Sequence, residues 1–322
     1  MTTTVTKMGE RFLWVDVVEP THQELQELAK KFGLHSTSVE DCLDPRHLPK
    51  FERIGALNFL VLRAYDESCP ADADTVQELT RKIAVFSTDE YLITIHRKDQ
   101  PFFRAFREKW CTREIQGSAD PSRTILRELI GEVFATYRGP IDGALDDLDA
   151  FEMGIFGEMG LRGVQGGRPF RIKQAYYLKR KAHVYRRMLR LSLDALIHVT
   201  TRASLEEAPL FQDIKENAER LFFYADELVE SVNSLLNLHV SLVSQKTTEA
   251  SNKINEVMRV LTVFSVFFLP LNLIAGIYGM NFEFMPELKW KVGYPLSIAL
   301  MLIVALGIMY WFRRRGWLRE LS

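Results

Sequence analysis

Few residues in this sequence of 322 could take part in chemistry, and the most distinctive of them lie in one short polar loop. The stretch YGMNFEFMPELKW, from Tyr278 to Trp290, has Asn281 near its head and lies between two long apolar runs. It offers almost no group for covalent chemistry. An amide such as that of Asn281 acts by donating and accepting hydrogen bonds, so the question is what polar species the loop meets.

The other candidates for a chemical site favour structural interpretations. An acidic cluster around a Cys-Pro turn consists of Asp66, Glu67, Asp72 and Asp74, and we expect a solvated loop there rather than a metal site. His239 is a lone histidine on an apolar helical stripe, where a packed side chain is more common than a ligand. The sequence has no glycine-rich phosphate loop, GxSxG or HExxH motif. It therefore predicts neither an enzyme nor a nucleotide-binding protein.

Composition and charge exclude further classes. The chain has 47% hydrophobic and 26% charged residues and a formal net charge of −1, so it has no basic footprint for nucleic acid. Cys42, Cys69 and Cys111 are far apart without CxxC spacing, so we expect no disulfide framework or zinc site. That cysteine usage fits a reducing cytoplasm. The first residues, MTTTVTKMGERFLWVD, lack the apolar core of a signal peptide.

Two uncharged runs near the C-terminus predict membrane-spanning helices. The runs from Val260 to Met280 and from Val292 to Phe312 are each 21 residues long, enough to cross about 30 Å of hydrocarbon at about 1.5 Å per residue. The aromatic residues that suit the two interfaces are Trp290, Tyr294, Tyr310, Trp311 and Trp317. The basic residues that the positive-inside rule places in the cytoplasm are Arg313, Arg314 and Arg315. Both termini are therefore predicted to be cytoplasmic, with Asn281 to Lys291 as the external loop.

Two helices alone cannot enclose a water-filled path, so any conducting form must be an oligomer. One narrow face of the first span recurs at steps of three or four. Its members are Met258, Leu261, Ser265, Leu269, Asn272 and Gly276. A neutral polar side chain in hydrocarbon either binds a neighbouring helix or lines a lumen. The sequence leaves both roles open for Asn272.

The first part of the chain predicts an α/β domain with a mixed sheet. The segments expected as strands are Arg11 to Val17, Ala56 to Ala64, Thr80 to Ser87 and Tyr91 to His96. Thr21 and Glu24 form a predicted capping box for a helix that Gly33 ends. Another helix is expected from Pro101 to Arg113.

After Pro121 the periodicity is helical. One helix is expected from Ser122 to about Met159 with many acidic residues, and one from Phe170 to about Arg202 with many basic residues. Either these charged faces meet each other or copies of each other, or both are solvated. The apolar stripe of a third helix consists of Ile214, Ala218, Leu221, Ala225, Leu228, Val232, Leu235, His239 and Leu242. One continuous helix of roughly 60 to 70 residues is expected to enter the membrane, with Pro270 as a candidate bend.

The C-terminal part resembles the CorA family of divalent-cation transporters. The family signature is Gly-Met-Asn after the first of two C-terminal spans, and here Gly279, Met280 and Asn281 occupy that position. The tripeptide alone is common, but its place at the end of a 21-residue span, before MPELKW and a second span that ends in basic residues, makes the match specific. The stretch from Trp14 to Lys50 also resembles the N-terminal region of the family.

This resemblance implies an α+β membrane protein that forms a funnel-shaped homopentamer, with an N-terminal α/β/α cytoplasmic domain, long stalk helices and two C-terminal transmembrane helices. The predicted divisions are 1–120 for the α/β domain, 121–256 for the stalk region, 257–281 for the pore-lining span, 282–291 for the external loop, 292–312 for the second span and 313–322 for the basic tail. The implied partners are copies of the chain, membrane lipid and divalent ions: Mg²⁺, with Co²⁺ or Ni²⁺ as further cargo. The implied location is the inner membrane.

In this picture the selectivity filter consists of Tyr278, Gly279, Met280 and Asn281. Mg²⁺ gives up water reluctantly, so five Asn281 amides would hydrogen-bond its hydration shell. Constrictions at Leu269, Leu261 and Met258, on the pore face described above, would exclude water when closed. The potential would drive influx without ATP, because a divalent ion gains about 4.6 kcal/mol per 100 mV.

Two features are less defined. Glu283 and Glu287 could concentrate cations at the external mouth, but nearby lysines cancel their charge, so a plain solvated loop is an equal alternative. The resemblance also implies closure by cytoplasmic Mg²⁺ bound between subunits. The segment just before the membrane offers only Glu249 and Glu256, so the sensing acids are not identified.

Two alternatives stay open at this point. One is a zinc transporter like the ZntB group of the same superfamily, against which the MPEL loop argues. The other is a membrane scaffold that does not conduct and has no need of Asn281.

Overall fold

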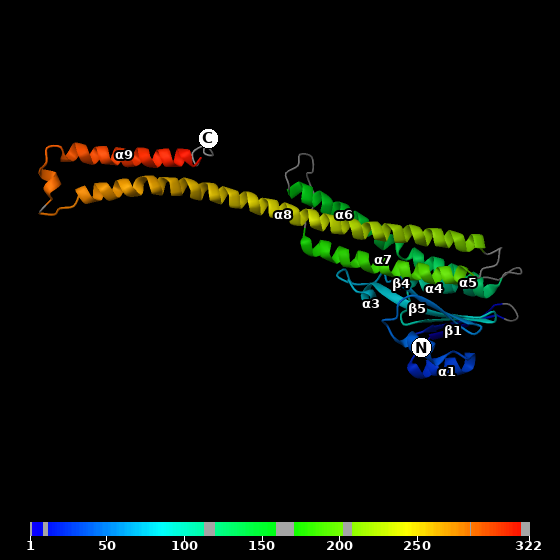
Figure 1. The fold of residues 1–322 in the computed structure, drawn as a ribbon. Helices are drawn as coiled ribbons and strands as arrows, with labels where there is room; N and C mark the ends of the chain where they lie inside the picture. Colours follow the sequence, from blue (N-terminus) through cyan, green and yellow to red (C-terminus); the bar gives the residue numbers. More distant parts are fainter. Residues whose placement is uncertain are drawn as a thin grey trace. The chain divides into compact units, whose positions relative to one another are not determined.

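The computed structural model describes residues 2–8, 12–112, 120–158, 171–201, 208–283 and 285–316. The chain divides into two compact units, Met1–His239 and Val240–Ser322 (Figure 1). The strands are β1 (Thr2–Met8), β2 (Phe12–Val18), β3 (Lys50–Ile54), β4 (Leu57–Tyr65), β5 (Thr80–Ser87) and β6 (Tyr91–His96). The helices are α1 (His22–Phe32), α2 (Ser36–Leu43), α3 (Val76–Leu79), α4 (Pro101–Cys111), α5 (Pro121–Ala135), α6 (Arg138–Glu158), α7 (Ile172–Thr200), α8 (Ala208–Tyr278), η1 (Pro286–Lys289) and α9 (Gly293–Arg314).

The strands of the first unit form one mixed sheet in the order β1-β2-β6-β5-β4-β3. β2 and β6 are parallel, and the other pairs are antiparallel. The four predicted strands are confirmed within one residue at each end. β1 and β3 were not predicted, because they are edge strands whose sequences, TTTVTKM and KFERI, lack a long apolar run.

Helices cover both faces of this sheet. On one face, α1 and α2 bury Leu25 and Val39 against strand residues such as Val15 and Phe86. The predicted capping box of α1 is confirmed, and Gly33 ends the helix with φ of 67°. On the opposite face lies α4, whose Phe106 ring packs 5.8 Å from the ring of Trp14 in β2. The chain thus leaves β2 toward one face and β6 toward the other.

The predicted helix from Ser122 to about Met159 is wrong in one respect, because the structure breaks it into α5 and α6 at Thr136 and Tyr137. Pro140 explains the break. A proline inside a helix lacks the N–H for the carbonyl four residues earlier, here that of Thr136, and its ring clashes with that carbonyl. In the first turn of α6 neither cost arises. The ends of the helical prediction at 159 and 170 lie outside the described residues.

The acidic face of α6 and the basic face of α7 do not pair with each other in the described residues. The exposed acids of α6 are Asp142, Asp146, Asp147, Asp149 and Glu152. On α7, Arg186 pairs instead with Asp226 of α8 at 3.0 Å, and Arg180 pairs with Asp74 at 3.2 Å. These acids of α6 are therefore exposed in the single chain and form no ion pair with α7 among its described residues.

Helix α8 is continuous from Ala208 to Tyr278 and passes through Pro270, as predicted. Within the first unit its apolar stripe is buried: Ala218, Ala225, Leu228, Val232 and Leu235. His239 is half-buried on the same stripe.

The second unit contains the apolar end of α8, η1 and α9. Both helices are long and apolar enough to cross a membrane. None of the most apolar 18-residue window of α8 is buried, and only 11% of that of α9 is buried. Each helix carries a stripe of partly or fully buried residues, with Val263, Phe267 and Ile274 on α8 and Ser297 and Phe312 on α9. These stripes are where the two helices face each other, and their remaining surface is open.

Candidate functional site

The Gly-Met-Asn tripeptide directly follows the end of α8 at Tyr278. The Gly279 N–H donates to the Ala275 carbonyl at 2.9 Å, and the Met280 N–H donates to the Ile277 carbonyl at 3.3 Å. A Cβ on Gly279 would lie 3.1 Å from the Ala275 oxygen, closer than most Cβ contacts. Glycine therefore lets the last turn close tightly. Asn281 follows as an exposed, non-helical residue.

The predicted pore face of α8 is open along its whole length in the single chain. Its six members, Met258, Leu261, Ser265, Leu269, Asn272 and Gly276, are all exposed. Leu269 is 72% exposed. The partly buried stripe that includes Val263 and Phe267 lies elsewhere on the same helix. The pore face is therefore the part of α8 that α9 leaves uncovered.

The polar groups of this face lack partners within one chain. Among the described residues, the structure gives the side chains of Ser265 and Asn272 no hydrogen-bond partner. Thr262, by contrast, donates to the Met258 carbonyl at 2.7 Å. An unsatisfied amide in hydrocarbon is costly. Asn272 thus requires either water or a polar group from another chain.

The external loop has a mixed charge. Glu283 and Lys289 are exposed, and Glu287 lies in η1 with a side chain outside the described residues. The predicted interfacial rings of Trp290 and Tyr294 are 59% and 77% exposed. The exposed residues at the other end of α9 are Tyr310, Trp311, Arg313, Arg314 and Arg315, whereas Trp317 lies outside the described residues.

No group of three or more histidine, cysteine, aspartate or glutamate side chains in the described residues is arranged to hold a metal ion. Glu249 and Glu256 are exposed on α8. Asp66 contradicts the prediction of a solvated acidic cluster, because it is 1% exposed and pairs with Arg81 at 2.9 Å and Lys98 at 2.8 Å. Burial raises the pKa of Asp66, but hydrogen bonds from Lys98 and Ser68 outweigh it and leave that pKa below its usual value. The prediction is therefore wrong for Asp66, whereas Glu67 and Asp72 are exposed as expected.

A buried polar network ties α4 to the sheet. Asp16 is 1% exposed and accepts hydrogen bonds from Thr94 at 2.6 Å, His96 at 3.1 Å and Arg107 at 2.8 Å. Arg107 also donates to Asp99 at 2.8 Å. Every carboxylate oxygen of Asp16 thus has a partner. The network is structural, since its groups satisfy one another.

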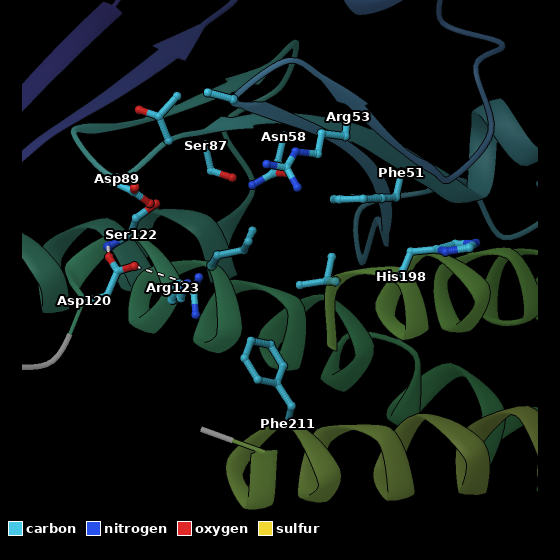
Figure 2. Close-up of a pocket in the computed structure, with 14 residues that line it drawn as sticks. Phe51, Arg53, Asn58, Ser87, Asp89, Asp120, Ser122, Arg123, His198 and Phe211 are labelled. Atoms are coloured by element: carbon cyan, nitrogen blue, oxygen red, sulfur yellow. Dashed lines mark hydrogen bonds and ion pairs between the residues drawn. The ribbon is translucent and has the colours of Figure 1, made fainter. Parts of the chain in front are cut away.

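Figure 2 shows a hollow of about 250 Å³ in the first unit, between strand residues such as Phe51 and Ser87 and helix residues such as Ser122 and His198. Phe51 stacks on His198 with ring centroids 6.3 Å apart. Asp120 accepts from the Ser122 N–H at 2.9 Å as the N-cap of α5, and burial raises its pKa. Asp120 and Ser122 are thus used in capping α5, and the carboxylate of this hollow serves the helix N-terminus.

Sequence reasoning missed a second cavity, lined by basic residues of the strands. Arg63 and Lys82 occur in the apolar strand sequences LNFLVLRAY and TRKIAVFS. Charged residues within such runs were the available signal, because lysine and arginine are rarely buried without partners.

The comparisons with known proteins agree on one family. The sequence pattern of CorA-like Mg²⁺ transporter proteins matches residues 9–314. The chain is 29% identical over 315 residues to the cobalt/magnesium transport protein CorA of Thermotoga maritima, covering 95% of this chain and 83% of that protein. It is 28% identical over 315 residues to the magnesium transport protein CorA of Haemophilus ducreyi, covering 95% and 92%. The complete structure of the CorA magnesium transporter from Methanocaldococcus jannaschii has the same fold, with a TM-score of 0.63, 21% identity and coverage of 97% and 93%.

Proposed function

Since the chain belongs to the family of CorA-like Mg²⁺ transporter proteins, we propose that it is a passive influx channel for hydrated Mg²⁺, with Co²⁺ or Ni²⁺ as competing cargo. In this proposal it spans the inner membrane twice with both termini in the cytoplasm. The membrane potential drives influx, at about 4.6 kcal/mol per 100 mV for a divalent ion.

The observation that carries the proposal is the position of Asn281. It directly follows the charge-free end of α8 and is exposed outside the helix. Mg²⁺ prefers octahedral oxygen ligands and dehydrates reluctantly. A ring of neutral amides would hydrogen-bond its water shell, whereas a ring of carboxylates would hold the ion and slow its release. Tyr278, Gly279 and Met280 complete this proposed filter.

The proposed conducting form is a homopentamer in membrane lipid. The open pore face and the partnerless Ser265 and Asn272 support an assembly that supplies neighbours or a shared lumen. The number five follows the family resemblance. Leu269, Leu261 and Met258 would then form apolar constrictions that stop conduction by excluding water.

Cytoplasmic Mg²⁺ is the closing signal in this proposal, acting between subunits. Carboxylates that repel one another across an interface come together when Mg²⁺ neutralises them. The exposed Glu249 and Glu256 are available to such an interface. At the external mouth, Glu283 and Glu287 would raise the local cation concentration.

The test is Mg²⁺ uptake into liposomes that contain the purified chain, followed with a Mg²⁺-sensitive dye under an inside-negative potential. Asn281→Ala should abolish the influx while the oligomer stays intact. The matched control is Asn252→Ala, which removes an exposed asparagine of α8 before the charge-free run and should leave influx unchanged.

Other outcomes would redirect the proposal. Influx of Zn²⁺ without Mg²⁺ would indicate a transporter like the ZntB group. An intact oligomer that gives no influx of any divalent ion would indicate a membrane scaffold. Normal influx in Asn281→Ala would remove the loop from the ion pathway.

A further inference from the structure

A cavity of about 480 Å³ lies at the carboxyl ends of the parallel strands β2 and β6. Its walls include Glu19 and Pro20, which follow β2, and Arg97 and Lys98, which follow β6. The chain leaves these two neighbouring strands toward opposite faces of the sheet, through α1 and α4. Open α/β sheets bind ligands in the crevice at such a switch point. The volume falls within the range for small-molecule sites, about 300 to 1,000 Å³.

The charged residues that line this cavity are mostly basic. The basic residues that line it are Arg63, Arg81, Lys82, Arg97 and Lys98. The one acidic residue in its lining is Glu19. Arg81 and Lys98 share the carboxylate of Asp66. For Arg63, Lys82 and Arg97, the described part of the chain places no carboxylate within ion-pair distance.

In the described part of the chain, the side chains of these three cations donate hydrogen bonds to hydroxyl and carbonyl oxygens. Arg63 is 2% exposed and donates to the Thr80 hydroxyl at 2.8 Å, to the Pro45 and His47 carbonyls at 2.9 Å each and to the Thr80 carbonyl at 3.3 Å. One of its five N–H groups has no partner in the described residues. Burying a charge without a counterion is costly, so the site is incomplete as a set of charges.

Lys82 is likewise a buried cation without a carboxylate partner in the described residues. It is 9% exposed and donates to the carbonyls of Asp41 and Asp44, which leaves its third N–H without a described partner. Burial is the main cause that lowers the pKa of Lys82 to about 8; Arg63 and Arg97 act in the same direction, and Cys42 and Asp44 act against it. The interior of this cavity is therefore a region of positive potential.

Capping explains part of this arrangement. Lys82, Arg63 and Arg97, which donates to the Leu43 carbonyl at 2.7 Å, complement the carbonyls at and after the C-terminus of α2. Capping accounts for these hydrogen bonds, but in the described residues it leaves the three positive charges without a counterion. Glu19 beside them has φ of 52°, a backbone state that is uncommon for non-glycine residues and clusters at functional sites.

We propose that this cavity is a binding site for a small phosphate-bearing anion free of bound metal. Arg63, Lys82 and Arg97 would bind the phosphate oxygens, since arginine and lysine are the preferred phosphate donors. Pro20, Leu43, Pro45 and Ile95 would hold an apolar or aromatic part of the ligand. A metal-bound phosphate is disfavoured, because the cation-lined wall repels the ion.

This site differs from the phosphate loops that are absent from the sequence. A glycine-rich loop binds phosphate with backbone N–H groups at a helix N-terminus, whereas here side chains of β4, β5 and the segment after β6 would do so. The prediction that the chain binds no nucleotide rested on the missing loop alone. It therefore does not bear on a site built from side chains.

The test is calorimetric titration of the full-length chain in detergent and EDTA, with ATP and with inorganic phosphate as separate probes. We expect saturable binding at one site. Arg97→Gln removes an exposed cation that contacts one backbone carbonyl, and it should weaken binding about tenfold or more. The matched control is Arg53→Gln, because Arg53 is also exposed, donates to one backbone carbonyl, that of Gly55, and lies outside this cavity. The control should bind as the original chain does.

A second experiment measures the proton that Lys82 takes up when the anion binds. Near pH 8 part of the Lys82 population is neutral, and a bound anion raises its pKa, so binding should take up protons from the buffer. Titrations in two buffers with different ionisation enthalpies measure that uptake. Binding of ATP and phosphate supports the site, and binding of phosphate alone restricts it to a single phosphate group. Absence of binding with both probes, or equal binding by Arg97→Gln and the original chain, would overturn the proposal.

Discussion

The two units of this chain handle their apolar side chains in opposite ways. In the first unit, large side chains such as Phe59, Phe86 and Leu79 are 0% exposed, and a sheet covered by helices on both faces buries them. In the second unit, Leu269 is 72% exposed and Ile303 is 67% exposed, although the sequence there is more apolar. A soluble monomer rarely exposes large apolar patches. The first unit buries its apolar core within a single chain, whereas the proposed function has lipid and further copies cover the second.

Polar groups show the same contrast. The first unit satisfies Asp16 with three donors, whereas the second leaves Asn272 without a described partner. A change that removes a polar partner should therefore affect stability in the first unit and transport in the second. Four variants test this difference, in order of expected size.

The largest effect should follow from breaking the Asp16 network. Asp16→Ala leaves Arg107 and His96 facing an apolar site, and loss of one partner of a buried charge pair costs about 3–5 kcal/mol. We expect a marked fall in the melting temperature of the first unit, measured by thermal unfolding in detergent. Asp142→Ala, on the exposed face of α6, should change stability by about 0.5 kcal/mol or less. Equal effects of the two variants would show that the network is not structural.

The next effect should appear in conduction. Leu269→Ser places a hydroxyl on the pore face and should wet the apolar constriction, raising the Mg²⁺ leak into liposomes about tenfold. Leu273→Ser is the matched control, since Leu273 is 63% exposed on the same helix but off the predicted face. A leak that rises equally in both variants would contradict the assignment of that face.

A smaller loss of flux should follow from Gly279→Ala. The new Cβ would approach the Ala275 carbonyl at 3.1 Å and shift the last turn that presents Asn281. We expect a reduction of a few-fold in the initial rate of Mg²⁺ uptake, because a displaced filter still forms. Gly307→Ala in α9, where a Cβ meets nothing within 4 Å, should keep the original rate. Unchanged uptake by Gly279→Ala would mean that this turn does not set the position of the filter.

The smallest effect concerns pH and returns to the first unit. Burial lowers the pKa of Lys82 to about 8, below its unfolded value of about 10.5. Between these values the unfolded chain binds more protons than the folded chain, so this group makes stability rise with pH across that window. The original chain should therefore gain in melting temperature relative to Lys82→Met from pH 8 to 10.5. If the difference in melting temperature between the two proteins stays constant across this range, folding does not lower the pKa of Lys82.

Much of the fold was predictable because its signals are local. Short runs rich in aliphatic, β-branched and aromatic residues predicted four of the strands. The Thr21–Glu24 capping box predicted α1, and uninterrupted helical periodicity predicted α8 through Pro270. The break at Tyr137 was missed although Pro140 marks it, because the apolar periodicity continues across it. The edge strands β1 and β3 were missed because their pairing, rather than their composition, makes them strands.

The candidate sites also differ in whether a local sequence signal defines them. The Gly-Met-Asn signature singles out Asn281 and a spacing along one helix defines the pore face; both are exposed, and their roles stay predictions. The burial of Asp66 and the cluster of Arg63, Lys82 and Arg97 could not, because β4, β5 and the segment after β6 come together only through strand pairing. The Asp66 prediction failed because acidity alone does not reveal a partner such as Arg81, which lies 15 residues away.

The central claim is that the second unit is incomplete as one chain and that transport requires copies of it. The most direct measurement is the protein mass of the active, detergent-solubilised particle, determined by light scattering with the detergent contribution subtracted, on the same preparation that is tested for Mg²⁺ uptake. The account predicts a particle of five copies of the 37.2-kDa chain. A particle of one chain that still carries Mg²⁺ across the bilayer would contradict it.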